Sequence, residues 1–297
     1  MNAQLDAEIL AALDELGHRI RGWQRISTIR AVETGRSVFR LDLESGEILK
    51  ARRLEDARIA RELFELRREL PQGFAPALHC RGRVLLEAWI DGEVLSTSQP
   101  TAAQLREAGA LLASLHTVRS ALGVSLPAPR STVIERQAAD ESARQLRAGE
   151  RLSASEIDRI GAALARLDPQ RALAGLVHTD FCGENMVIDA AGRLRVIDNE
   201  RMGVGPLGLD FARTWYRWML PPPAWEAFRA SYRACMPHDE PLRDFAFWAL
   251  VATLNSAALF SRIDSARAEL PIECLRRIMA QLEHKPEGIA AGGRSHR

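Results

Sequence analysis

The sequence predicts an α+β protein with a small, strand-rich N-terminal lobe and a larger, mostly helical C-terminal lobe. Short apolar segments bounded by turn residues fill the first 90 residues, and long segments with apolar residues at helical spacing follow them. The length of 297 residues is long for one core and comfortable for two. We expect lobes over residues 1–90 and 91–283, followed by a flexible tail over 284–297.

The N-terminal lobe is expected to contain two helices and five strands. The first helix is amphipathic, with its apolar face formed by Leu5, Ile9, Leu13 and Leu16. Strands are predicted over 24–31, 37–43, 47–53, 75–80 and 83–90, because turn residues punctuate these apolar segments. The second helix is predicted over 54–70, with its apolar face formed by Ile59, Leu63, Leu66 and Leu70.

The C-terminal lobe opens with a strong helix-start signal. Thr101 with Gln104, and later Ser153 with Glu156, have the spacing of a capping box before an apolar stretch. A short hairpin is predicted over 186–198. Further helices are expected over 224–236, 242–263 and 272–283, whereas the polar, mixed segment 121–150 predicts no regular element.

Charge and cysteine content narrow the possible partners and compartment. A net charge of +1 gives no strong field for nucleic acid or a membrane surface. No apolar run reaches the roughly 18 residues of a membrane span, and the N-terminus lacks the features of a signal peptide. The cysteines form no C-x-x-C pair, which favours reduced thiols in a cytoplasmic protein: Cys80, Cys182, Cys235 and Cys274.

The scarcity of lysine draws attention to Lys50. Of the 40 basic residues 38 are arginine, and the only lysines are Lys50 and Lys285. Lys285 lies in the polar tail, whereas Lys50 ends an apolar strand. A compact ammonium and a planar guanidinium bind differently, so a lysine kept among so many arginines suggests a position that requires an ammonium.

The octet HTDFCGEN, residues 178–185, gathers polar side chains between two apolar strands. The hairpin that follows it would return Asp198 to the neighbourhood of Asn185, where one carboxylate and one amide oxygen suit magnesium. Asp180 could then face a substrate hydroxyl. An H-x-D-x-x-x-x-N pattern, an Asp about a dozen residues later and an upstream strand lysine match the signature set of kinases.

These residues resemble a known family, the aminoglycoside phosphotransferase and choline kinase-like group of small-molecule kinases. The resemblance rests on HTDFCGEN, VIDNERMGVGPLGLDFART, LLEAWIDGEVL and EILKARRL, and it extends over about residues 24–235. It implies a bilobal, protein-kinase-like fold and transfer of the γ-phosphate of ATP, with Mg²⁺, to a small-molecule hydroxyl. Nucleic acid and membranes are not expected as partners.

Site roles follow from the resemblance at the matching positions. In the catalytic loop, Asp180 would be the catalytic base and His178 would orient the loop, which Asp210 would brace. Asn185 and Asp198 would hold magnesium.

The resemblance also assigns the nucleotide-binding positions. Lys50 would hold the phosphates, and Glu62 would fix it by an ion pair. Ser37 belongs to the loop that would cover the phosphates, and the main chain from Glu87 to Trp89 would bind adenine.

The sequence also departs from the family pattern. The phosphate-covering loop has a single glycine, Gly35, and Asn199 stands where the family usually has an aromatic residue. A non-catalytic nucleotide-binding pseudokinase is therefore an alternative. A protein kinase is a weaker one, because the chain passes from Asp198 to Asp210 without a long activation segment.

The acceptor is expected to be neutral or partly apolar. From residue 222 onward nine acidic and ten basic residues leave no acidic basin for a polycation. The same region supplies aromatic side chains that could form the core or line a pocket: Trp225, Phe228, Tyr232, Phe245, Trp248 and Phe260.

Overall fold

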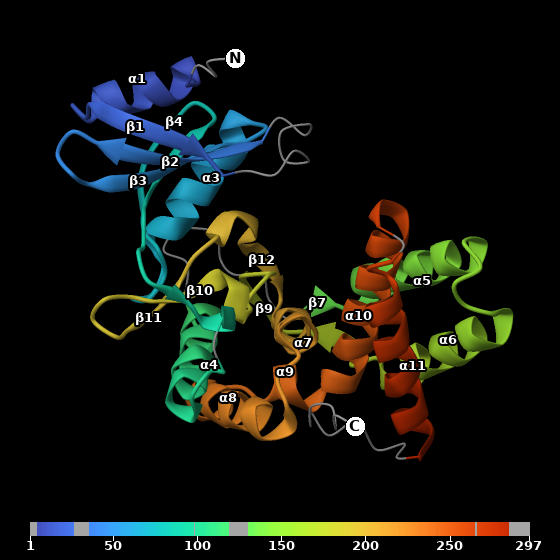
Figure 1. Ribbon diagram of the computed structural model, residues 1–297. Coiled ribbons are helices and arrows are strands. Elements are labelled where there is room, and N and C mark those ends of the chain that lie inside the picture. The colour runs from blue at the N-terminus through green and yellow to red at the C-terminus, as the bar shows by residue number, and fades with distance from the viewer. Residues whose placement is uncertain (1–4, 27–35, 98, 119–129, 265, 285–297) are drawn as a thin grey trace. The chain divides into compact units, whose positions relative to one another are not determined.

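The computed structural model describes residues 5–26, 36–97, 99–118, 130–264 and 266–284, which form two compact units (Figure 1). The first unit combines the N-terminal residues up to 98 with the segment Glu184–Gly203. The second unit contains the helical remainder of the chain. The predicted α+β class is confirmed, since a strand-rich N-terminal sheet is followed by a mostly helical region.

A five-stranded antiparallel sheet forms the centre of the first unit. In spatial order its strands are β1 (Ile20–Arg25), β2 (Ser37–Leu43), β3 (Ile48–Arg53), β5 (Val84–Ala88) and β4 (Ala77–Arg81). Because successive side chains of a strand point to opposite faces, each strand offers alternate residues to one core. Burial along β2 alternates strictly, as the predicted strand over 37–43 requires.

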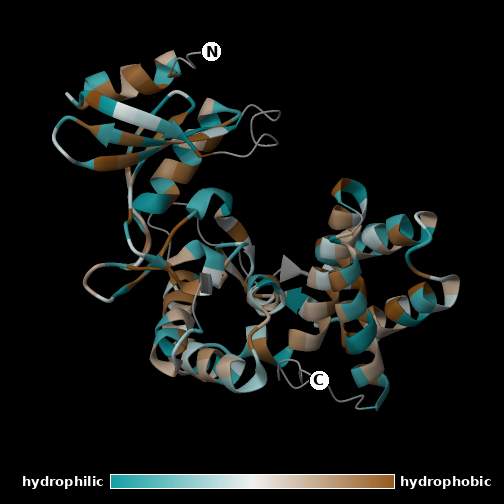
Figure 2. Ribbon diagram, viewed as in Figure 1, coloured by the Kyte–Doolittle hydropathy of each residue, from teal (hydrophilic) through white to brown (hydrophobic). Residues whose placement is uncertain are grey.

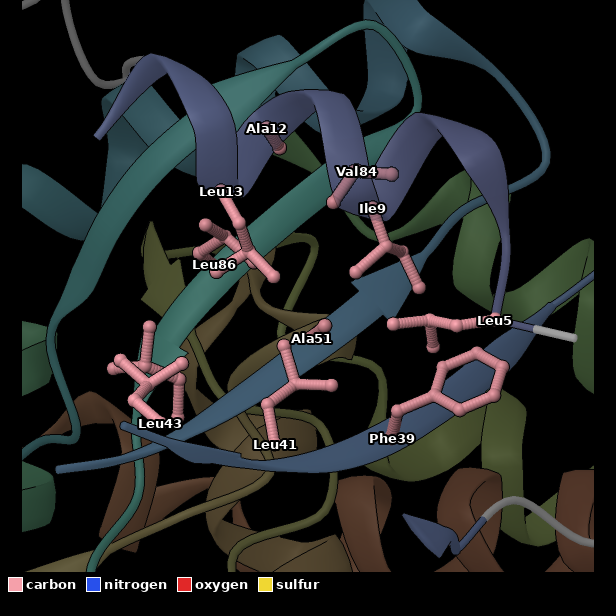
Figure 3. Packing of buried hydrophobic residues seen from close by; sticks show 11 residues of the cluster. Leu5, Ile9, Ala12, Leu13, Phe39, Leu41, Leu43, Ala51, Val84 and Leu86 are labelled. Atoms are coloured by element: carbon pink, nitrogen blue, oxygen red, sulfur yellow. The ribbon is translucent and has the colours of Figure 1, made fainter. Parts of the chain in front are cut away.

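Helix α1 (Ala7–Glu15) covers one face of this sheet and closes the apolar core of the unit. Its hydropathy alternates between polar and apolar sides (Figure 2). Figure 3 shows the side chains of Leu5, Ile9 and Leu13 directed at those of the strands, among them Phe39 and Leu86. The predicted amphipathic helix is confirmed, except that Leu16 is 39% exposed because the helix has ended before it.

Helix α3 (Ala57–Arg68) packs against β4 and β5 with a face that only partly coincides with the predicted one, because Leu63 is buried and Leu66 half-buried. Its buried residues are Ala60, Leu63 and Arg67, which are spaced as one helical stripe. Ile59 is 36% exposed, so the predicted apolar face was wrong at this position. The reason is that a buried arginine with ionic partners replaces an apolar residue in the stripe, which a hydrophobic pattern does not reveal.

The predicted hairpin is confirmed as β10 (Met186–Ile188) and β11 (Leu194–Val196). β10 also pairs with β6 (Glu93–Val94), which follows the last strand predicted for the N-terminal lobe. Val196 donates its N–H to Gly73 O at 2.7 Å and accepts from Ala75 N at 2.8 Å. The hairpin thus groups with the sheet, although the predicted division placed it in the second lobe.

The second unit consists mainly of helices. They are α4 (Ala102–His116), α5 (Val133–Ala148), α6 (Ala154–Leu167), α7 (Leu207–Trp218), α8 (Pro222–Cys235), α9 (Glu240–Arg243), α10 (Phe245–Ile263) and α11 (Glu269–His284). Two short strand pairs accompany them, formed by β7 (Arg130–Ser131) with β8 (Arg171–Ala172) and by β9 (Ala174–Val177) with β12 (Gly203–Pro206).

Helix α10 is the central helix of the second unit. It packs against α5, α6, α7 and α11, and 12 of its 19 residues are buried. Its length and apolar composition alone would suit a membrane span, and it is the one such helix among the described residues. Burial among four other helices accounts for that composition without a membrane.

Several predicted boundaries differ from the structure. β1 begins at Ile20, four residues before the predicted strand, of which residues 27–31 lie outside the described residues. Helix α5 occupies part of the segment 121–150, where no regular element was predicted. The predicted tail lies outside the described residues except for His284, the last residue of α11.

Both predicted capping boxes are present. Thr101 with Gln104 starts α4, and Ser153 with Glu156 starts α6. The Glu156 carboxylate accepts from Ser153 N at 2.8 Å and from Arg276 Nε at 2.7 Å. The hydrogen bond from Arg276, followed by that from Ser153, lowers the pKa of Glu156 from 4.5 to about 2.

Replacing Glu156 by Gln should make the free energy of unfolding less dependent on pH in the acid range. Gln can keep the capping box but has no charge for Arg276, so we expect a loss of about 1 kcal/mol at pH 7. A lowered pKa stabilises the fold fully above 4.5, and this contribution is lost as pH falls toward 2. Urea unfolding measures the free energy of unfolding of wild type and of Glu156→Gln. The difference between the two proteins should be smaller at pH 3.5 than at pH 7. A pH-independent difference would contradict the ionic contribution.

Candidate functional site

A small cavity in the first unit has apolar walls and a charged end. Its volume is about 140 Å³, and its lining combines Ile26, Ala75, Ala88, Trp89, Ile90 and Ile197 with Lys50, Glu87 and Asp198. Apolar walls suit a flat ring, whereas the ammonium at one end suits an anionic group. The cavity can therefore hold a molecule that is apolar at one end and anionic at the other.

Lys50 lies on β3, where the strand faces the cavity. Its Nζ is 3.2 Å from Asp198 Oδ1 and 4.0 Å from Glu87 Oε2. Burial lowers the pKa of Lys50 below 10.5, although both carboxylates act in the opposite direction. Lysine scarcity thus led to a buried side chain with two carboxylate partners.

The hairpin brings Asn185 and Asp198 to the same end of β10 and β11. Ile197 donates its N–H to Asn185 O at 2.9 Å, which extends the hairpin pairing by one step toward Asp198. Asp198 has a left-handed backbone, with φ at 59°, which is uncommon for a residue other than glycine. Such conformations persist where the surroundings enforce them, and they concentrate at functional sites.

The donor set at the hairpin end fits magnesium. One carboxylate and one amide oxygen are the hard ligands that this ion takes from proteins, the rest being water and phosphate oxygens. Asp198 keeps 36% of its side chain exposed, so one side of the carboxylate remains accessible. Among the described residues no group of three His, Cys, Asp or Glu side chains is placed to hold a metal ion, so the donor set here is one carboxylate with one amide.

Arg52, which the sequence did not single out, is the residue on which the ion pairs of this site converge. Its side chain is 2% exposed, and its guanidinium contacts Asp198 Oδ1 at 2.6 Å, Glu87 Oε2 at 3.5 Å and the Glu200 carboxylate. Burial raises the pKa of Asp198, but the charges of Arg52 and Lys50 outweigh it and hold the pKa well below 3.8. Asp198 is therefore fixed as an anion.

The predicted ion pair of Glu62 with Lys50 was wrong. Glu62 lies on the outer face of α3, with 62% of its side chain exposed, and its Oε1 accepts from Arg58 at 2.7 Å. The inner face of α3 carries Arg67 instead, which binds the buried carboxylate of Glu87. A spacing of twelve residues from Lys50 does not determine which side of the helix a glutamate takes.

The predicted role of the Glu87 main chain in binding adenine stays a prediction. Its main chain lies inside the sheet, opposite Lys50 on one side and Ala77 on the other. Glu87 is one of the residues that line the cavity, and its Oε2 lies 4.0 Å from Lys50 Nζ. Burial raises the pKa of Glu87, but Arg67, Arg52 and Lys50 together lower it from 4.5 to about 2.

Trp89 follows the strand and lines the cavity, and its predicted role in binding adenine stays a prediction. Its Nε1 donates to Asp91 Oδ1 at 2.7 Å, and Arg40 stacks 5.1 Å from its ring. Ser37 is buried at the start of β2, opposite Arg53. The loop residues 33–35 before it, including Gly35, lie outside the described residues, so the covering role of Ser37 stays a prediction.

In the second unit, Asp210 of α7 holds the backbone of residues 178–180, which are called the HTD segment below. Its carboxylate accepts from the N–H of His178 at 2.8 Å and from that of Thr179 at 2.6 Å. Thr179 has a φ of 68°, a strained value for a β-branched residue. The two hydrogen bonds to a buried anion stabilise this strained turn.

A buried chain of hydrogen bonds supports Asp210 in turn. His116 Nε2 lies 3.1 Å from Asp210 Oδ2, and His116 Nδ1 lies 2.7 Å from the Tyr232 hydroxyl. Burial raises the pKa of Asp210, but the hydrogen bond with His116 leads the effects that keep it below 3.8. Burial also raises the pKa of Tyr232, so its hydroxyl keeps its proton and can donate to Nδ1.

Helix α7 contacts the HTD segment at a second point. Arg217 Nε donates to Asp180 Oδ1 at 2.9 Å, and both side chains are partly exposed. Arg217 lies two helical turns beyond Asp210, which places both on one side of α7. One helix therefore fixes the backbone of the segment with Asp210 and the carboxylate of Asp180 with Arg217.

Of the two roles left open for the aromatic residues of this unit, core or pocket, burial supports the core. Five of the six aromatic residues suggested for core or pocket are buried: Trp225, Phe228, Tyr232, Phe245 and Trp248. Most of them stack around Phe211 of α7, with ring centroids 4.6 to 6.0 Å apart. They form the core behind the HTD segment and do not offer a surface to an acceptor.

The sequence did not indicate Arg52, Arg67 or Arg217 as site residues. Because 38 of the 40 basic residues are arginine, composition does not single out any one of them. Two weak signals exist. Arg52 follows Lys50 by two positions and so shares its face of the strand, and Arg67 follows Leu63 by four positions within the buried stripe of α3.

Comparisons with known proteins identify the family and the fold of the chain. A sequence model described as phosphotransferase enzyme family matches residues 5–245. A search of curated proteins gave no match. Among solved structures, a choline kinase from Cryptosporidium parvum superposes with a TM-score of 0.65 at 14% identity, over 95% of this chain and 98% of that one.

Two antibiotic-modifying enzymes are also similar in fold. A macrolide 2'-phosphotransferase from Brachybacterium faecium gives a TM-score of 0.62 at 17% identity, over 90% of this chain and 97% of that one. A spectinomycin phosphotransferase, solved with ADP and spectinomycin, gives 0.65 at 12% identity, over 96% and 100%. Identities this low show a common fold and leave the substrate open.

Replacing Asp210 by Asn should destabilise the second unit. One of the two backbone N–H groups would face an amide NH₂ instead of a carboxylate oxygen, so we expect a loss on the order of 3 kcal/mol. Chemical denaturation at pH 7 measures this loss. Asp239→Asn, an exposed change in the same unit, is the control and should stay within about 0.5 kcal/mol. Equal stabilities of the two variants would contradict the role of Asp210.

Proposed function

Because the chain belongs to the phosphotransferase enzyme family, we propose that it transfers the γ-phosphate of ATP to a hydroxyl group of a small molecule. The observation that carries the proposal is the cavity of the first unit, whose apolar walls lead to Lys50 and Asp198. Adenine would occupy the apolar part, and the phosphates would extend toward the ammonium. Phosphoryl transfer needs these two functions, positioning and charge neutralisation, more than it needs covalent chemistry.

Asn185 and Asp198 would hold the magnesium ion. When bound, this ion neutralises charge on the phosphates. Arg52 keeps the Asp198 carboxylate in place and anionic, and Lys50 supplies a positive charge for the phosphate oxygens.

Asp180 would accept the proton of the attacking hydroxyl. Arg217 binds its Oδ1 and so orients the carboxylate, while Asp210 holds the loop backbone that carries it. A base held in one rotamer loses little entropy on reaching the transition state.

The acceptor would be neutral or anionic near the reacting hydroxyl. The guanidinium of Arg217, 2.9 Å from the base, would repel an ammonium group of the acceptor. The position of Arg217 therefore supports the expectation of a non-cationic acceptor. The aromatic residues no longer support it, because they are buried. Similar folds accept choline and macrolides, so the fold alone does not decide between such classes.

ADP release from Mg-ATP in the presence of candidate acceptors tests the proposal. The panel would contain macrolides, sugars, sugar acids, amino alcohols and aminoglycosides, with a generic protein substrate for comparison. We expect release that depends on one class of neutral or anionic small molecule. Asp180→Asn should lower kcat by about a thousandfold or more while nucleotide affinity changes little. Nucleotide binding without turnover of any acceptor would favour the non-catalytic alternative.

Replacing Asp198 by Asn should act on the metal complex itself. Loss of the ligand charge should weaken Mg-ADP binding by about tenfold, while metal-free ADP binding should weaken less. Isothermal titration calorimetry with and without magnesium separates the two. Equal losses in both conditions would show that Asp198 holds no magnesium.

A further inference from the structure

We propose that Glu87 is the residue that positions Lys50 for the phosphates and that Arg67 anchors Glu87 to helix α3. This inference rests on the proposed function. In the family pattern a glutamate of the helix would pair with the lysine directly, and Glu62 was expected to do so. The structure assigns that task to a strand carboxylate, and the helix contributes a cation instead.

The sheet places Glu87 beside Lys50. The two residues are direct partners across the antiparallel strands β3 and β5, so their side chains share one face of the sheet. Lys50 Nζ lies 4.0 Å from Glu87 Oε2, and both side chains line the cavity. This placement depends on strand register alone and does not require any movement of α3.

Arg67 fixes the other half of the carboxylate. Its side chain is fully buried, it binds Glu87 Oε1, and its Nη2 donates to Ala75 O at 2.6 Å. Arg67 is thereby attached to the sheet by two partners. Because Oε1 is bound by Arg67, Oε2 is directed at the two cations of β3, Lys50 and Arg52.

Glu87 Oε2 is buried and accepts no hydrogen bond from the described residues, although Lys50 and Arg52 lie within 4.0 Å. A buried carboxylate oxygen without a hydrogen bond is costly unless a donor can reach it. Lys50 currently bonds Asp198, the proposed magnesium ligand. Glu87 can provide Lys50 with a second buried counter-ion when Asp198 binds the metal, which keeps the ammonium at the charged end of the cavity.

The glutamates of α3 do not compete for this role. Glu62 and Glu65 pair with exposed arginines of their own helix, namely Arg58, Arg61 and Arg68. Both lie outside the buried stripe that meets the sheet. Helix α3 is therefore linked to Lys50 through Arg67 and Glu87. The helix contributes a cation to this link, where the family pattern has a helix carboxylate.

Binding of adenosine and of ADP to the full-length chain tests this role without an acceptor. Calorimetry gives the gain in affinity that the phosphates add to adenosine in wild type, Glu87→Gln and Lys50→Met. We expect Glu87→Gln to weaken ADP binding by about tenfold or more, as loss of a supporting residue commonly does, and to leave adenosine binding within about twofold. Lys50→Met defines the full loss of the phosphate contribution.

Glu62→Gln is the matched control, because it makes the same chemical change on the exposed face of α3. It should leave both affinities and the melting temperature unchanged. Glu87→Gln leaves Arg67 without its anionic partner and could prevent folding, so a charge-balanced double variant, Glu87→Gln with Arg67→Met, accompanies it. The double variant should also lose the ADP increment while melting cooperatively.

The outcomes are distinct. Loss of the ADP increment in Glu87→Gln or in the double variant, with adenosine binding kept, supports the positioning role. An unchanged increment in a folded variant overturns it, as does an equal loss for adenosine and ADP, which would indicate a structural role only. If the wild type binds neither ligand, the proposed function fails and this inference fails with it. Loss of the ADP increment in Glu62→Gln instead would overturn the inference and assign the positioning of Lys50 to Glu62 of α3.

Discussion

Arg52 buries a full positive charge inside the strand-rich unit, and residues of the sheet and of the hairpin segment neutralise it. Three carboxylates converge on its guanidinium, those of Asp198, Glu87 and Glu200. An unpaired ion at this depth would cost several kcal/mol, so the buried guanidinium depends on partners from both the sheet and the hairpin segment. The hairpin β10–β11 thereby joins the sheet, and Asp198 is delivered to Lys50 as a consequence of the same neutralisation.

The charges of this cluster balance. Lys50, Arg52 and Arg67 face as many carboxylates, so the cluster is formally neutral at pH 7. Neutrality explains how so many ionised groups remain buried next to an apolar cavity. It also means that a phosphate ligand and its metal would redistribute existing ion pairs, since every cation at the cavity already has a partner.

The helical unit solves a similar problem with hydrogen bonds. Asp210 is buried, yet two backbone N–H groups and His116 satisfy its carboxylate, and Tyr232 supports His116 from behind. The strain at Thr179 is held by the same carboxylate. Each unit thus holds a residue with a left-handed backbone near a predicted functional position: the cations Arg52 and Lys50 hold the carboxylate of Asp198, and the buried carboxylate of Asp210 holds the backbone of Thr179.

Local sequence determined the elements whose causes are local. The capping boxes at Thr101 and Ser153 depend on residues three positions apart, and the hairpin at 186–198 depends on its own turn, so both were predicted correctly. Composition singled out Lys50, because its rarity is a property of the chain. The strand-then-helix order likewise gave the fold class.

Only the tertiary structure decided which charges pair. Glu62 and Arg67 occupy the same helix, and sequence spacing cannot tell which of them meets the sheet, because that depends on the rotation of α3 set by packing. The partners of Asp180 and of Asp210 lie 37 and up to 94 residues away along the chain. An ion pair needs two side chains within a few ångströms, and a sequence fixes such distances only within one element.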